Sequence, residues 1–151
     1  MTYKSFEALP VWQEAAELYD RTDEFLEHAP PRMRSAFRNQ LERAALSVSN
    51  IIAEGFERGT TNELLQFIYI ARGSADEVRS MLCLAQRRPW AKPFDRVLTD
   101  LKSSASCARE LRGWAESLQN SEIRVQRHLT KAVRQRFEDK QRAMACEKRS
   151  L

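Results

Sequence analysis

The feature that most constrains this chain is a helical periodicity of apolar residues over positions 41–82, interrupted once near residues 56–59. On both sides of the interruption, apolar residues recur at alternating spacings of three and four, which is typical of a helix with one core-facing side. The residues that carry the pattern are Phe37, Leu41, Ala44, Val48 and Ile51 before the break, and Leu64, Ile68, Ala71, Ala75, Val78 and Leu82 after it. The pattern predicts two long helices packed as an antiparallel hairpin.

The break itself carries turn and capping signals. Gly55 and Gly59 are predicted to supply backbone positions that tolerate a positive φ at a helix end. The segment Thr60-Thr61-Asn62-Glu63 matches a capping box, in which Thr60 caps the next helix and Glu63 reaches back to it. We therefore expect the four residues Phe56 to Gly59 to form the turn.

The same stretch carries a family resemblance. The segments QLERAALSVSNIIAEGFERGT (40–60) and FIYIARGSADEV (67–78), with upstream matches at Phe6, Leu9, Val11, Trp12, Gln13 and Ala15, resemble the "four helix bundle protein" family, also called 23S rRNA intervening sequence proteins. The likeness covers roughly residues 6–118, and its motif positions include Asn50, Glu54, Gly55, Arg58, Gly73 and Ser74. It implies a four-helix bundle that assembles into a barrel-shaped pentamer, with no enzymatic activity. A related branch comprises the accessory variability proteins of diversity-generating retroelements, which are basic pentamers that bind nucleic acid and a reverse transcriptase.

The positions of the prolines along the chain agree with four helices. Pro10 suits the first turn of a helix that Pro30-Pro31 ends, and a second proline-containing link at 87–93 separates the third helix from a fourth over residues 94–118. With 151 residues and only four glycines, the chain has room for one core and favours long helices. We predict an all-α, antiparallel up-down-up-down four-helix bundle over residues 1–119, followed by a basic C-terminal tail over 120–151.

Two features of the third helix point to close contacts. Gly73-Ser74 lies at mid-helix, where glycine is unfavourable, and counting outward from the turn places Gly73 opposite Leu41, Ala44 and Ala45. We interpret it as a position where the two helices approach closely. The segment 64–71 is apolar almost all round, so it is either deeply buried or in contact with another subunit, and we expect a homo-oligomer. The predicted interface residues are Leu65, Phe67, Tyr69 and Ile70.

The tail differs in charge from the rest of the chain. Residues 120–151 hold nine Lys or Arg against four Asp or Glu, a net charge of +5, so residues 1–119 sum to −1 in a chain of net charge +4. On a helix its apolar residues would share one side and its basic residues the other. The predicted nucleic-acid-binding residues are Arg124, Arg127, Lys131, Arg134 and Arg142. Both a helical tail and a disordered tail stay open.

No chemistry of an enzyme or a metal site is predicted. Neither His28 nor His128 follows a glutamate by three residues, as a di-iron bundle would need, and the candidate nucleophiles lack a base partner, so we expect no catalytic residue, no metal and no cofactor. Asn50, Glu54 and Arg58 share one helix face, either as a ladder that fixes the turn or as a contact surface. Without a signal peptide or an apolar run long enough for a membrane span, a cytoplasmic protein is expected.

Two functions remain open at this point. The first is a non-enzymatic nucleic-acid-binding accessory protein, a homo-oligomer for which the resemblance implies five subunits, which contacts the phosphates of RNA or DNA and has a reverse transcriptase as a candidate partner. The second is a structural or protein-interaction module that binds no nucleic acid. The sequence decides neither the subunit count nor the choice between RNA and DNA.

Overall fold

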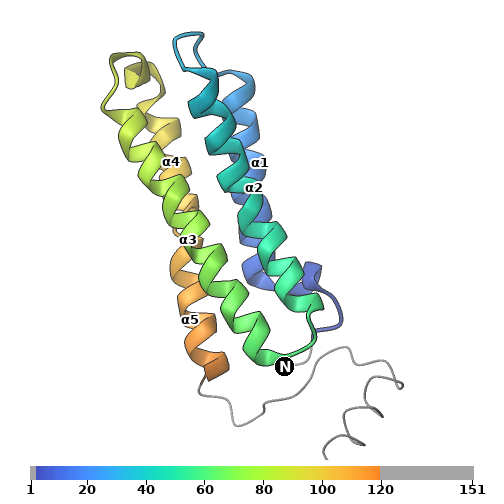
Figure 1. The fold of residues 1–151 in the computed structure, drawn as a ribbon. Coiled ribbons are helices and arrows are strands. Elements are labelled where there is room, and N and C mark those ends of the chain that lie inside the picture. Colours follow the sequence, from blue (N-terminus) through green and yellow to red (C-terminus); the bar gives the residue numbers. More distant parts are fainter. Residues whose placement is uncertain (1–2, 120–151) are drawn as a thin grey trace, which may run out of the picture.

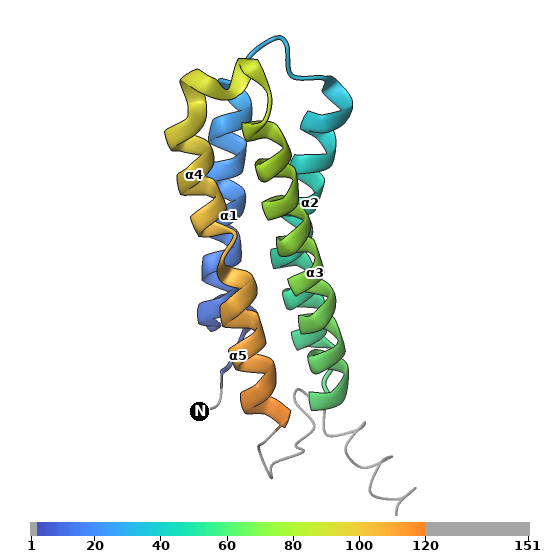
Figure 2. The same ribbon diagram turned by 90° about the vertical axis from the view of Figure 1, so that its left-hand side faces the viewer.

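The computed structural model describes residues 3–119, and these residues form helices without a strand. The elements are η1 (Phe6–Ala8), α1 (Pro10–Glu27), α2 (Ser35–Glu57), α3 (Thr61–Gln86), η2 (Pro89–Phe94), α4 (Asp95–Ser104) and α5 (Cys107–Gln119). Figures 1 and 2 show the connections at alternating ends of an elongated bundle, with α4 and α5 in succession along its fourth edge. The predicted all-α fold with four packed helices is confirmed; the predicted tail lies outside the described residues.

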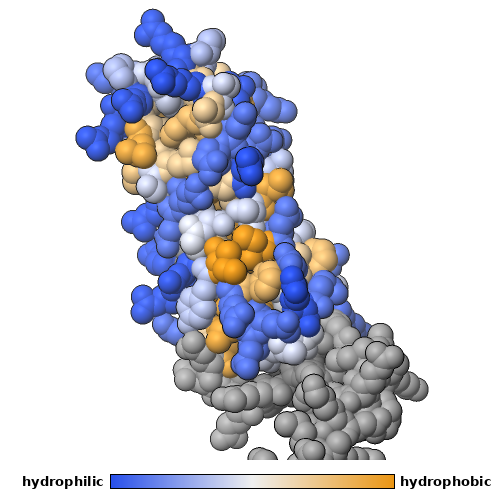
Figure 3. Space-filling view, viewed as in Figure 1, coloured by the Kyte–Doolittle hydropathy of each residue, from blue (hydrophilic) through white to orange (hydrophobic). Residues whose placement is uncertain are grey.

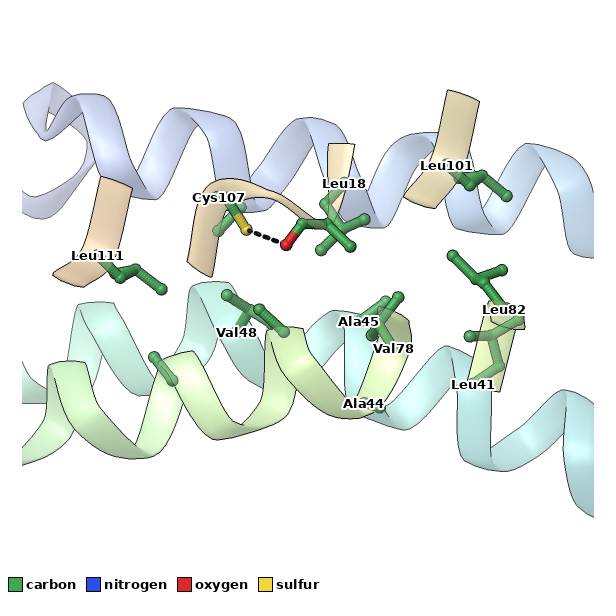
Figure 4. Close-up of a cluster of buried hydrophobic side chains, with 14 of the residues drawn as sticks. Leu18, Leu41, Ala44, Ala45, Val48, Val78, Leu82, Leu101, Cys107 and Leu111 are labelled. Carbon is green, nitrogen blue, oxygen red and sulfur yellow. Dashed lines mark hydrogen bonds between the residues drawn. The ribbon is translucent and has the colours of Figure 1, made fainter. Parts of the chain in front are cut away.

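The core runs the whole length of the bundle. Its fully buried side chains come from all the long helices and include Leu18, Leu41, Val48, Leu82 and Leu111. Figure 4 shows several of these side chains meeting between the helices, with Ala44 and Ala45 where α2 and α3 approach. Because burial of each large aliphatic side chain contributes about 1.5–3 kcal/mol, this continuous seam stabilises the helices more than their local propensities do.

The turn between α2 and α3 differs from its prediction at two residues. Phe56 is 1% exposed and lies inside α2, which continues to Glu57, so the break comprises only Arg58, Gly59 and Thr60. Burial of the Phe56 ring holds the last helical turn in place. Gly59 has a φ of 86°, as predicted, and the Thr60 hydroxyl accepts a hydrogen bond from the Glu63 N–H at 3.2 Å. The Glu63 carboxylate does reach back, but it accepts a hydrogen bond from the Thr60 hydroxyl at 2.6 Å.

Neither of the two motif glycines, Gly55 and Gly73, has the role that was predicted for it. Gly55 does not have a positive φ; it lies buried within α2, where a Cβ would stand 3.0 Å from Cγ of Phe67 on α3 and closer still to the Phe67 Cβ. Gly55 is therefore the position of close helix approach. Gly73, predicted for that role, is exposed, and a Cβ there would meet no atom within 4 Å.

The fourth helix is divided, although its apolar spacing predicts a continuous one. Ala105 and Cys107 are both buried, yet residues two apart on one helix point about 200° away from each other. The chain resolves this conflict with a tight turn, in which the Ser106 N–H donates to the Ser103 carbonyl at 2.9 Å. Because of this interruption, the apolar faces of both α4 and α5 point toward the core. The interruption also shapes the surface beside α3.

Candidate nucleic-acid interface

A basic groove lies where α3 passes the interruption between α4 and α5. It encloses about 480 Å³, and the helices that border it, α3, α4 and α5, face the viewer in Figure 2. We call this site the basic groove. Its lining residues are Arg72, Asp76 and Arg79 from α3, Lys102 and Ser103 from α4, Ala105 and Ser106 from the turn, and Arg109 and Arg112 from α5.

Helical spacing brings these side chains together. Arg72, Asp76 and Arg79 follow one another at intervals of four and three, so they share the flank of α3 that faces the fourth edge. Arg109 and Arg112 are three residues apart on α5 and point to the groove because Cys107 and Leu111 turn toward the core. The small side chains of Ser103, Ala105 and Ser106 leave the space between them open.

The groove carries an excess of positive charge. Five cationic side chains line it against the single carboxylate of Asp76. Within residues 3–119, Arg79 and Arg109 have neither an ion-pair nor a hydrogen-bond partner for their side chains. Unpaired guanidinium groups in a concave site focus a positive potential and attract phosphate oxygens, which arginine binds in bidentate fashion.

The other three cations are held in place by neighbours that leave their charge largely available. The Arg72 guanidinium lies 5.2 Å above the Tyr69 ring, and Lys102 Nζ donates to the Gln86 amide oxygen at 2.9 Å. Arg112 Nε donates to Glu116 at 2.9 Å, an exposed pair. Neutral partners orient a cation without cancelling it, and an exposed ion pair gives way readily to a competing anion.

Sequence reasoning missed the basic groove because it weighed net charge. The helix α1 has six carboxylates against Arg21 alone, which hides the local excess of cations elsewhere in residues 1–119. The signal that could have found the groove is the pair Arg72 and Arg79, one heptad apart on α3. Its second half, Arg109 and Arg112, depends on the interruption between α4 and α5, which the sequence pattern did not reveal.

The residues predicted for nucleic-acid binding in the tail, Arg124 to Arg142, lie outside the described residues. The motif residues Glu54 and Arg58 lie at the α2–α3 turn, away from the basic groove. Their side chains form an ion pair at 2.5 Å, and the Arg58 guanidinium also lies 5.1 Å above the Phe67 ring. The hydrogen bond from Arg58 to Glu54 and the Glu54 charge raise the Arg58 pKa above its ordinary value. These contacts favour the ladder interpretation, although Asn50 is exposed beside the pair rather than bonded to it.

The predicted interface residues divide by exposure. Leu65 is half-buried against the core and Phe67 is half-buried, whereas Tyr69 and Ile70 are exposed, Ile70 by 55%. Figure 3 shows a hydrophobic cluster about halfway along the molecule, on the face that α2 and α3 present in Figure 1. Ser74 is half-buried beside the exposed Gly73.

Residues 3–119 contain neither a candidate metal-binding cluster nor a candidate membrane-spanning helix. Among residues 3–119 no group of three or more histidine, cysteine or acidic side chains could hold a metal ion. None of the helices over this range is both long enough and apolar enough to cross a membrane.

Comparison with known proteins identifies the family. No curated protein matches the sequence. The family model of the 23S rRNA-intervening sequence protein matches residues 7–109, which is more than half of the chain and includes α1, α2, α3 and α4. A bundle of four packed helices agrees with this match. The chain therefore belongs to the 23S rRNA-intervening sequence protein family.

Proposed function

We propose that this protein is a non-enzymatic, oligomeric accessory protein that binds nucleic acid by contacts to phosphates. The observation that carries the proposal is the basic groove, where Arg79 and Arg109 have no ion-pair partner among the described residues. A cation that no carboxylate neutralises costs little to transfer to a phosphate. The family name, which refers to ribosomal RNA, makes RNA the first ligand to test, with DNA beside it.

Two further parts of the proposal rest on the resemblance to the accessory variability proteins. These are assembly into a homopentamer and a reverse transcriptase as the protein partner. Five subunits would present five basic grooves and five tails of net charge +5, which multiplies a modest field into a strong one. The tail residues Arg124, Arg127, Lys131, Arg134 and Arg142 belong to this proposal as additional phosphate contacts.

A second candidate function is a structural or protein-interaction module that binds no nucleic acid. The observation that favours it is the exposed apolar surface of Ile70 and Leu84 on α3, which are 55% and 48% exposed. The net charge of −1 over residues 1–119 also favours it. Both functions permit oligomerisation, so nucleic-acid binding separates them.

The test is a titration of labelled RNA and DNA at several salt concentrations. We expect the full-length protein to bind at low salt, with an affinity that falls steeply as salt rises. Combining Arg79→Gln with Arg109→Gln should weaken binding and flatten the salt dependence by about 0.7–0.9 in slope for each phosphate that the variant no longer neutralises. A chain that ends at Leu118 measures the contribution of the tail in the same way.

The matched control combines Arg21→Gln with Arg43→Gln. Both arginines are exposed and lie outside the basic groove, so this variant changes net charge equally. Its salt slope should stay close to that of the unaltered protein. Equal losses of affinity in the two double variants would mean that net charge rather than the groove drives binding. No binding by the full-length protein at low salt would reject the proposal in favour of the interaction module.

A further inference from the structure

A second pocket lies at the end of the bundle where α1 joins α2 and α3 joins η2. It encloses about 470 Å³ between the start of α2 and the end of α3. We call it the end pocket. Its lining residues are Arg32, Met33, Arg34, Phe37, Leu84, Ala85, Arg88 and Trp90.

The end pocket combines an apolar floor with a cationic rim. Met33 and Ala85 are buried at its base, Phe37 and Trp90 are half-buried, and Leu84 is 48% exposed. The charged residues of its lining are arginines alone, Arg32, Arg34 and Arg88, with no carboxylate. Figure 3 shows a hydrophobic area near the upper end of the molecule, bordered by strongly hydrophilic side chains.

The groups that line this pocket have unused binding capacity. Over residues 3–119, Arg32, Arg34 and Arg88 take part in no side-chain ion pair or hydrogen bond, and the Trp90 indole N–H has no acceptor. Neither Phe37 nor Trp90 stacks on another ring in this part of the chain, unlike Trp12, which meets the Phe6 ring edge-on. The pocket thus offers aromatic surface and bidentate donors to a ligand that is both planar and anionic.

We propose that the end pocket binds a nucleotide of single-stranded nucleic acid, with its base against Trp90 and its phosphate on the rim arginines. This inference rests on the proposed nucleic-acid binding and adds a preference for single strands, because a base paired within a duplex cannot enter the pocket. The basic groove has no aromatic lining residue and contacts phosphates of either form. The two sites therefore have different roles. The basic groove attracts phosphates, and the end pocket binds an unpaired base.

The experiment uses the fluorescence of Trp90 in the full chain. Trp12→Phe combined with Trp114→Phe leaves Trp90 as the single tryptophan of the 151 residues. The probe is an unstructured twelve-residue oligouridylate, compared with the same strand annealed to its complement. We expect the single strand to quench Trp90 emission and to bind more tightly than the duplex. A Trp90→Ala substitution in the otherwise unaltered chain should weaken single-strand binding about tenfold, and duplex binding little.

Trp90→Phe keeps an aromatic face and should retain most of the single-strand affinity, whereas a change of fold would lower both affinities together. Salt-dependent RNA binding with unchanged Trp90 emission and equal affinity for both forms would overturn this inference while leaving the proposed function intact. Absence of all RNA binding would reject both. Quenching by a glutamate-rich peptide with a central leucine, but not by the oligouridylate, would assign the end pocket to an acidic protein partner and overturn the inference.

Discussion

At the scale of single residues, we expect substitution by alanine to have opposite effects on stability at Gly55 and at Gly73. Gly55→Ala should lower the free energy of unfolding by about 1–3 kcal/mol, because the added Cβ would collide with the Phe67 Cβ, which cannot move without α3. Gly73→Ala should raise it by up to about 1 kcal/mol, because alanine favours the helix and the site is open. Urea denaturation of both variants measures the pair. A neutral Gly55→Ala variant would contradict the close approach of α2 and α3.

Glu14 gives a prediction about pH. Although Glu14 is exposed, partial desolvation of its carboxylate and the nearby charges of Glu110 and Glu17 raise its pKa above the ordinary value, so the folded state disfavours its ionised form. Its ionisation therefore destabilises the fold fully above the folded-state pKa, and this effect disappears below the unfolded-state pKa of about 4.3. Glu14→Gln should raise the Tm at neutral pH. The gain should vanish when the melting curves are repeated at acid pH, and a gain that persists there would refute the electrostatic cause.

At the scale of elements, the interruption between α4 and α5 follows from the phase of the apolar residues. A continuous helix through Ala105 would turn Leu111 about 120° away from the core side. Insertion of one alanine after Ala105 would bring Cys107, Leu111 and Ala115 back to within about 60° of Ala105 on a continuous helix. We expect the insertion variant to stay folded and to gain helical signal in far-ultraviolet circular dichroism.

Deletion of Ser106 is the matched control, because it moves Leu111 and Ala115 further from alignment with Ala105. The deletion variant should lose several kcal/mol of stability, since side chains such as Leu111, which is fully buried, leave the core. If the deletion is tolerated and the insertion is not, helical phase does not explain the interruption.

At the scale of the whole molecule, the exposed apolar residues of α3 predict self-association. Ile70→Lys should reduce the mass measured by light scattering toward the 17.6 kDa of one chain, because a charge there cannot be buried against a second copy. Val97→Lys is the control, a similar change at a 44% exposed position on α4 that the interface prediction does not include. A stable monomer for the unaltered protein at micromolar concentration would reject the assembly.

Assembly also bears on Gly73. This glycine is three residues from Ile70 on α3, so a neighbouring subunit that packs on Ile70 would also approach it. If Gly73→Ala stabilises the monomer yet weakens association, the glycine serves the contact between subunits. Light scattering of the Gly73→Ala variant beside the unaltered protein measures this association.

The sequence by itself determined that helices pack in a bundle, where α1, α2 and α3 lie to within a few residues, and most of the core residues. Apolar periodicity, Pro10 at the start of α1 and the Thr60 cap of α3 are local signals, and each acts within a few residues along the chain. The roles of Gly55 and Gly73 were not local, because a glycine in a helix looks the same in sequence whether its missing side chain faces a neighbour or solvent. Only packing against Phe67 decided between them.

The candidate sites were decided by tertiary structure almost entirely. The basic groove joins Arg72 and Arg79 to Arg109 and Arg112, and the end pocket joins Phe37 to Trp90, pairs far apart in the chain. Net charge could not predict either site, because it sums α1 carboxylates and groove arginines that the fold keeps on different elements. A local field depends on which side chains share a surface, and the antiparallel arrangement of helices determines that surface.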